Sequence, residues 1–130
     1  MKRHTLLLAL AIPALSLACS SSDKDSDAEA SAPIIDCAKA TVPKYSELGF
    51  LQTTCAQCHS STKTGAAARQ AAPDDVNFDT YEAAKAAATR AVGELYEDPP
   101  AMPPADAKLT PVTDAERIQL NTWAQCETPQ

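Results

Sequence analysis

Apolar positions repeat at helical spacing along this chain, and no stretch alternates apolar and polar residues as a half-buried strand does. Three segments predict helices. The first runs from about Pro43 to Thr54, the second from Asp79 to about Leu95, and the third from Thr113 to about Cys126. Proline-rich and polar turns separate them. The pattern predicts an all-α fold whose ordered part starts near residue 34.

Each predicted helix carries a start signal. Pro43 stands at an early position of the first, and Asp79 with Glu82 predicts an N-terminal cap for the second. Thr113 with Glu116 predicts a capping box for the third. The inner faces expected from helical spacing are Tyr45, Leu48 and Leu51 in the first helix, and Ala115, Ile118, Thr122, Trp123 and Cys126 in the third.

Residues 1–18 have the charged start, short apolar middle and small-residue exit of a secretory signal peptide. Residues 15–19 resemble the lipobox of bacterial lipoproteins, so Cys19 is the expected lipidation site. The alternative is cleavage near Ala18 without lipidation. Residues 19–33 are polar without apolar periodicity and predict a disordered tether, which leaves 34–130 as the domain. The apolar run is shorter than the roughly 20 residues that span a bilayer, so we expect membrane attachment through the lipid only.

Charge and composition narrow the function classes. Removal of residues 1–18 takes away two basic residues and no acidic one, which changes the formal net charge from −6 to −8. This acidic balance argues against nucleic acid as a partner. Aromatic residues make up only 5% of the chain, so the core is thin and a bound prosthetic group would fill it.

Residues 55–59, Cys-Ala-Gln-Cys-His, match the C-x-x-C-H pattern of c-type haem attachment. In that pattern the thiols of Cys55 and Cys58 bond to the two haem vinyl groups, and His59 binds the iron. Beyond residue 18 the chain has one histidine, His59, and one methionine, Met102, so counting excludes two haems and bis-histidine ligation. Met102 is the expected sixth ligand, because the stiff prolines around it can hold a weakly binding thioether in place.

Each of the five cysteines can be assigned to one expected role. Cys19 is assigned to lipid, Cys55 and Cys58 to haem, and Cys37 to a disulfide with Cys126. That disulfide would join the two ends of the domain and close a loop of about 90 residues. On the loop-entropy model such a bond contributes roughly 4 to 5 kcal/mol of stability.

Other sites use the same residue types. Zinc would need four ligands, and an oxidising compartment favours bridged thiols over metal-bound ones. The candidate zinc ligands are Cys37, Cys55, Cys58 and either His59 or Cys126. A thioredoxin-like dithiol would follow a strand in a βαβ pattern, which this sequence lacks. Met102 has the alternative of a loop methionine that fills a gap.

The order of these motifs resembles that of the small class I cytochrome c domains of bacterial secreted proteins, over about residues 45–126. The segments that carry the resemblance are 50–59, 77–84, 102–104 and 109–116, followed by Trp123. The resemblance implies a cytochrome c-like fold, with three to four helices around one covalently attached haem c. The pair Cys37 and Cys126 is a departure from the family.

An iron atom bound by both His59 and Met102 has no open position for a substrate, so we expect one-electron transfer and not enzymatic catalysis. The leading expectation is a monomeric, periplasm-facing membrane lipoprotein that passes electrons between redox partner proteins. The alternatives are a haem-based sensor or ligand-binding module, and an accessory electron-transfer subunit of a larger oxidoreductase. By charge alone, the candidate partners of the haem propionates are Arg69, Lys85 and Arg90, each of which is otherwise expected on the solvated surface.

Overall fold

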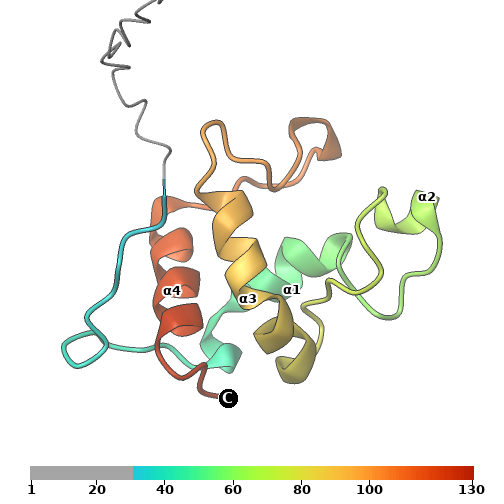
Figure 1. Cartoon of the computed structure of the whole chain (residues 1–130). Helices are drawn as coiled ribbons and strands as arrows, with labels where there is room; N and C mark the ends of the chain where they lie inside the picture. The colour runs from blue at the N-terminus through green and yellow to red at the C-terminus, as the bar shows by residue number, and fades with distance from the viewer. Residues whose placement is uncertain (1–30) are drawn as a thin grey trace, which may run out of the picture.

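The computed structural model describes residues 31–130, and this part of the chain contains helices and no strand (Figure 1). The α-helices are α1 (Gly49–Thr53), α2 (Ala66–Arg69), α3 (Tyr81–Leu95) and α4 (Asp114–Gln125), and the 3₁₀ helices are η1 (Tyr45–Glu47), η2 (Cys55–Gln57) and η3 (Ala105–Ala107). The predicted all-α class is confirmed. The predicted signal peptide and residues 19–30 of the predicted tether, with the expected lipidation site Cys19, lie outside the described residues.

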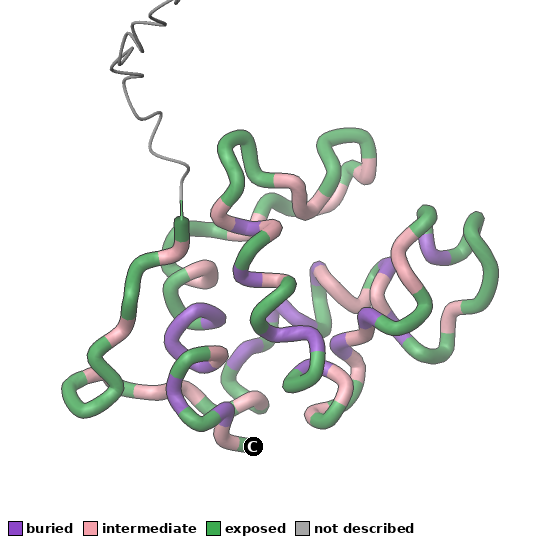
Figure 2. Tube along the Cα trace, viewed as in Figure 1, coloured by how far each residue is buried: buried purple, intermediate pink, exposed green. Residues whose placement is uncertain are grey.

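The helices α3 and α4 pack side by side (Figure 1), and buried residues of α1 share one hydrophobic cluster with residues of both. Buried positions gather where these helices meet (Figure 2). The Trp123 ring is fully buried there, with its centroid 6.2 Å from that of Tyr45 and 6.4 Å from that of Tyr81. Such aromatic contacts stabilise a core beyond the area they bury. None of the described helices is both long and apolar enough to cross a membrane.

The predicted helix starts are correct for α4 and displaced for α3. The Thr113 hydroxyl accepts a hydrogen bond from the Glu116 N–H, and the Glu116 carboxylate accepts one from the Thr113 N–H, which confirms the capping box. At α3 the cap is Thr80, not Asp79. The Asp79 carboxylate instead accepts hydrogen bonds from the N–H and hydroxyl of Ser61, so it fastens the turn that follows the Cys-Ala-Gln-Cys-His motif.

The inner face predicted for α4 is correct in its second half only. Trp123 and Cys126 are buried, whereas Ala115 is exposed and Ile118 is 52% exposed. Leu120 joins the core in their place, because α3 packs against the side of α4 that carries Leu120 and Trp123.

The first predicted helix is interrupted at Leu48, whose φ of −86° and ψ of 57° leave the helical region. Tertiary hydrogen bonds explain the break. The Tyr45 N–H donates to the Pro129 carbonyl at 2.9 Å, and the Tyr45 hydroxyl donates to the Phe78 carbonyl at 2.8 Å. These bonds hold η1 against other segments, and Gly49 at the start of α1 further disfavours a continuous helix.

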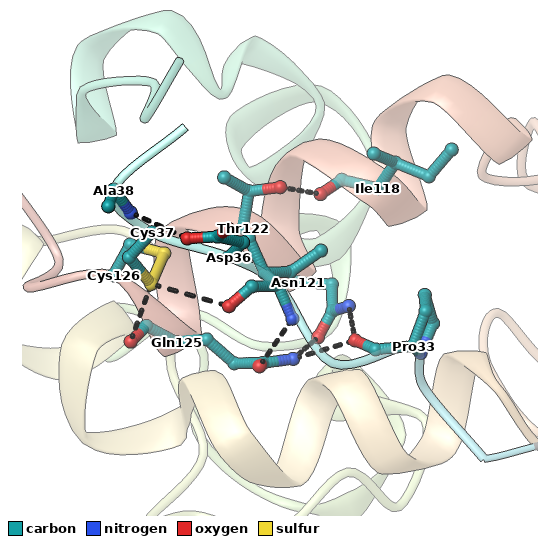
Figure 3. Close-up of a disulfide and its surroundings, with 10 residues drawn as sticks. Pro33, Asp36, Cys37, Ala38, Ile118, Asn121, Thr122, Gln125 and Cys126 are labelled. Atoms are coloured by element: carbon teal, nitrogen blue, oxygen red, sulfur yellow. Dashed lines mark hydrogen bonds between the residues drawn. A yellow bond between two sulfur atoms is a disulfide. The ribbon is translucent and has the colours of Figure 1, made fainter. Parts of the chain in front are cut away.

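The two ends of the domain are joined by a disulfide between Cys37 and Cys126, the pair to which the cysteine count led (Figure 3). The side-chain amides of Asn121 and Gln125 also donate to the Pro33 carbonyl, at 2.8 and 3.0 Å. The chain before α1 therefore runs along α4 and is fastened to it by covalent and hydrogen bonds.

Candidate functional site

A pocket of about 690 Å³, a volume that includes the open solvent at its mouth, is lined by residues of η2, α3 and α4 and of the loops before α3 and before α4. The four residues that the sequence analysis links to haem all line it: Cys55, Cys58, His59 and Met102. The remaining lining is mostly apolar and consists of Thr54, Pro73, Val76, Phe78, Arg90, Ala91, Glu94, Leu95, Pro103, Pro104, Leu109, Val112 and Leu120.

One tight turn brings the two thiols and the imidazole to this pocket. The Cys55 carbonyl accepts from the N–H groups of both Cys58, at 3.2 Å, and His59, at 2.9 Å. Neither cysteine is in a disulfide. Burial, with the Glu116 carboxylate as a second cause, raises the pKa of Cys55 to about 12. This side chain is therefore an uncharged thiol at neutral pH.

The His59 ring is oriented by the backbone of the loop that follows it. Its Nδ1 lies 3.1 Å from the Val76 carbonyl oxygen, and because a carbonyl only accepts, Nδ1 carries the proton and Nε2 keeps a free lone pair. The edge-to-face contact with the Phe78 ring, at 5.6 Å between centroids, restricts the imidazole further. Burial lowers the pKa of His59, so the ring is held in the neutral form that binds metals.

Met102 lies on the proline-rich segment between α3 and α4, and its side chain packs against the core. The next two residues, Pro103 and Pro104, line the pocket with it. The Ala101 N–H donates to the Glu94 carbonyl at 3.0 Å, which fastens this segment to the last turn of α3. A stiff backbone with a fixed attachment point therefore delivers the thioether to the pocket.

Of the three candidate propionate partners, only Arg90 lines the pocket. Lys85 lies over the Tyr81 ring, with Nζ 5.8 Å from the ring centroid. Arg69 is 2% exposed, so its expected place on the solvated surface is wrong. Its guanidinium donates to backbone carbonyls of the loop between η2 and α3, which include that of Val76.

Zinc fits these residues poorly. The Cys37–Cys126 disulfide removes two of the five candidate zinc ligands, and the rest do not make up four. Over residues 31–130, no three His, Cys, Asp or Glu side chains are grouped so that they could hold a metal ion. The absence of strands from this part of the chain also argues against a thioredoxin-like dithiol.

Sequence reasoning missed the Val76 carbonyl, and it named Arg69 by its charge alone, without predicting that the guanidinium is buried beneath the loop. A backbone carbonyl leaves no side-chain signature, and a lone arginine in an alanine-rich segment gives no sign that it is buried. Comparisons with protein-family models, with curated proteins and with solved structures give no match to this chain.

Proposed function

We propose that this chain is an electron-transfer protein with a cytochrome c-like fold and one covalently attached haem c. One observation carries the proposal: two free thiols, a neutral imidazole and a thioether, the donor set that this cofactor needs, line a single apolar pocket. Cys55 and Cys58 would form the two thioether bonds, and His59 and Met102 would be the axial ligands. When bound, haem supplies a one-electron change between ferric and ferrous iron.

The residues of the pocket would favour the reduced state. Apart from the charged side chains of Arg90 and Glu94, the lining is mostly apolar. Such a surface excludes water and disfavours an added charge on the iron. The neutral thioether of Met102 acts in the same direction, whereas the hydrogen bond from His59 to Val76 keeps the imidazole in one tautomer and orientation. We therefore expect a positive reduction potential and no open position for a substrate, as in a carrier and not an enzyme.

We also propose that the protein acts outside the cytoplasm, because thioether attachment of haem occurs there and the predicted signal peptide would send the chain there. A lipid on Cys19 would hold it to a membrane that faces the periplasm. We propose that it acts as a monomer between redox partner proteins, without nucleic acid.

Haem attachment is tested by expression with a periplasmic haem-attachment system, followed by spectra of the denatured protein. We expect covalent haem in the native protein and none in Cys55→Ser/Cys58→Ser. The matched control is Cys37→Ser/Cys126→Ser, which removes the same number of sulfur atoms away from the lining of the pocket and should still carry haem. A native protein without covalent haem contradicts the proposal.

Axial ligation is tested with Met102→Ala. In the family, methionine sulfur on ferric iron gives a weak far-red absorption band, which we expect in the native protein and not in the variant. Ferrous native protein should not bind carbon monoxide, whereas ferrous Met102→Ala should bind it. Ready binding of carbon monoxide by the native protein would favour the sensor alternative, and copurification with an enzyme would favour the accessory-subunit alternative.

A further inference from the structure

Arg69, the last residue of α2, is the centre of the loop that connects η2 to α3. Its side chain is 2% exposed, and the only carboxylate within residues 31–130 that pairs with it, that of Asp74, belongs to a side chain that is 93% exposed. A buried cation is costly unless hydrogen bonds replace its water shell. The oxygen atoms that accept from the guanidinium are the backbone carbonyls of Ser60, Lys63, Ala72, Pro73 and Val76 and the side-chain carbonyl of Asn77.

The backbone is strained where it folds around this cation. Gln70 and Ala71, directly after Arg69, have φ values of 49° and 63°, in the left-handed region that side chains other than glycine rarely adopt. These two left-handed residues reverse the chain direction, so that the carbonyls of Ala72 and Pro73 reach the guanidinium of Arg69 at the end of α2. Strain of this kind persists only where other contacts offset it, and it concentrates at functional sites.

One of the carbonyl groups that accept from Arg69 also accepts a hydrogen bond from His59. The Val76 oxygen lies 3.1 Å from Nη2 of Arg69 and 3.1 Å from Nδ1 of His59. A carbonyl oxygen has two lone pairs, so both donors can bind at once. Because the guanidinium is positive, its hydrogen bond withdraws electron density from the oxygen that His59 also uses.

We propose that Arg69 is a positioning residue that sets the basicity of His59 through the shared Val76 carbonyl. The inference rests on the proposed function, in which His59 is the proximal ligand of haem iron. A strong acceptor at Nδ1 makes a histidine ligand more basic, which favours ferric iron, and Arg69 weakens that acceptor. Arg69 therefore raises the reduction potential, and its buried positive charge acts in the same direction. The guanidinium does not deprotonate in proteins, so the effect is constant with pH.

The test is Arg69→Met in the haem-loaded protein, since methionine keeps much of the length and removes the charge and the donors. At a fixed applied potential we expect the ratio of ferric to ferrous protein to rise by about threefold to tenfold, where tenfold corresponds to about 59 mV for one electron. The matched control is Ser61→Ala, which removes a hydrogen bond to Asp79 in the same loop but no donor to Val76. It should lower thermal stability and leave the potential unchanged.

A second measurement needs no variant and stands if Arg69→Met does not fold. In ferrous native protein, which is diamagnetic when both axial ligands are bound, magnetic resonance detects couplings across hydrogen bonds. We expect couplings to the Val76 carbonyl carbon from both Nδ1 of His59 and Nη2 of Arg69. A coupling from His59 without one from Arg69, or equal potentials in native protein and Arg69→Met, overturns the inference. Absence of covalent haem from the native protein overturns the proposed function instead.

Discussion

Arg90 and Glu94 stand one turn apart on α3 with Nε and Oε1 3.9 Å from each other, and in the described part of the chain they are the only aspartate, glutamate, lysine or arginine side chains that line the pocket. The separation is longer than a hydrogen bond, and both side chains are partly exposed. An exposed pair of this kind contributes little to stability. The Arg90 guanidinium is therefore available to an anionic group of a ligand, such as a haem propionate.

We expect Arg90→Gln to lower the reduction potential of the haem-loaded protein. Loss of a positive charge at the pocket favours the more positive ferric state, by about threefold in the ratio of ferric to ferrous protein at a fixed potential, or about 28 mV. Spectra recorded during a redox titration measure the shift. Lys85→Gln is the matched control, because it removes one positive charge from the same helix outside the pocket lining. Equal shifts in the two variants would exclude a specific role for Arg90.

Local signals in the sequence predicted the parts of the fold that depend on neighbouring residues. Thr113 and Glu116 form the cap that their spacing predicts, because both partners belong to one helical turn. The two pocket cysteines and His59 converge for the same reason, since η2 and the two residues directly after it carry all three side chains. Met102 lines the same pocket as these three residues, although it lies more than 40 positions further along the chain.

Long-range hydrogen bonds account for what the sequence did not predict. The break at Leu48 depends on the hydrogen bond between Tyr45 and Pro129, which are 84 positions apart. The type of neither residue predicts that this bond forms. Asp79 has the spacing of a helix cap but binds Ser61 instead, since the turn after the pocket motif offers it several donors at once. Side-chain type and spacing do not reveal such choices between partners.

The Cys55 thiol should react slowly in haem-free protein. Its pKa of about 12, against 9.0 for an ordinary cysteine, reduces the thiolate fraction at pH 8 by about a thousandfold, and the thiolate is the reactive form. We expect alkylation by iodoacetamide to be slower by at least about a hundredfold than in the same protein unfolded in urea. Mass spectrometry of the peptide that contains Cys55 measures both rates. Similar rates in the folded and unfolded protein would show that the folded structure does not protect this thiol.

Gly93 is expected to be a position where alanine stabilises the protein. It lies within α3, and an added Cβ atom would meet no atom within 4 Å apart from its chain neighbours and the backbone of its own helix. Glycine in a helix costs about 0.5 to 1 kcal/mol relative to alanine, so Gly93→Ala should raise the free energy of unfolding by that amount and the melting temperature by a few degrees.

The control is Gly65→Ala, which also has open space around the added atom but has a φ of 79°. Alanine is strained in that conformation, so this variant should melt below the native protein. Circular dichroism during heating measures both changes. A decrease in melting temperature for Gly93→Ala would mean that α3 is not regular at this position.

The Cys37–Cys126 bond should stabilise the domain without any effect on the pocket. It closes a loop with a sequence separation of 89, and on the loop-entropy model its removal in Cys37→Ser/Cys126→Ser costs about 4 to 5 kcal/mol. Urea unfolding of the haem-loaded protein measures this loss as a lower midpoint. The haem spectrum should be unchanged because neither cysteine lines the pocket. Native protein treated with a reductant is the control for the substitutions themselves, and it should unfold at the same low urea concentration as the variant. If the variant and the reduced protein both unfold at the midpoint of the untreated native protein, the hydrogen bonds along α4 suffice to hold the ends of the domain together.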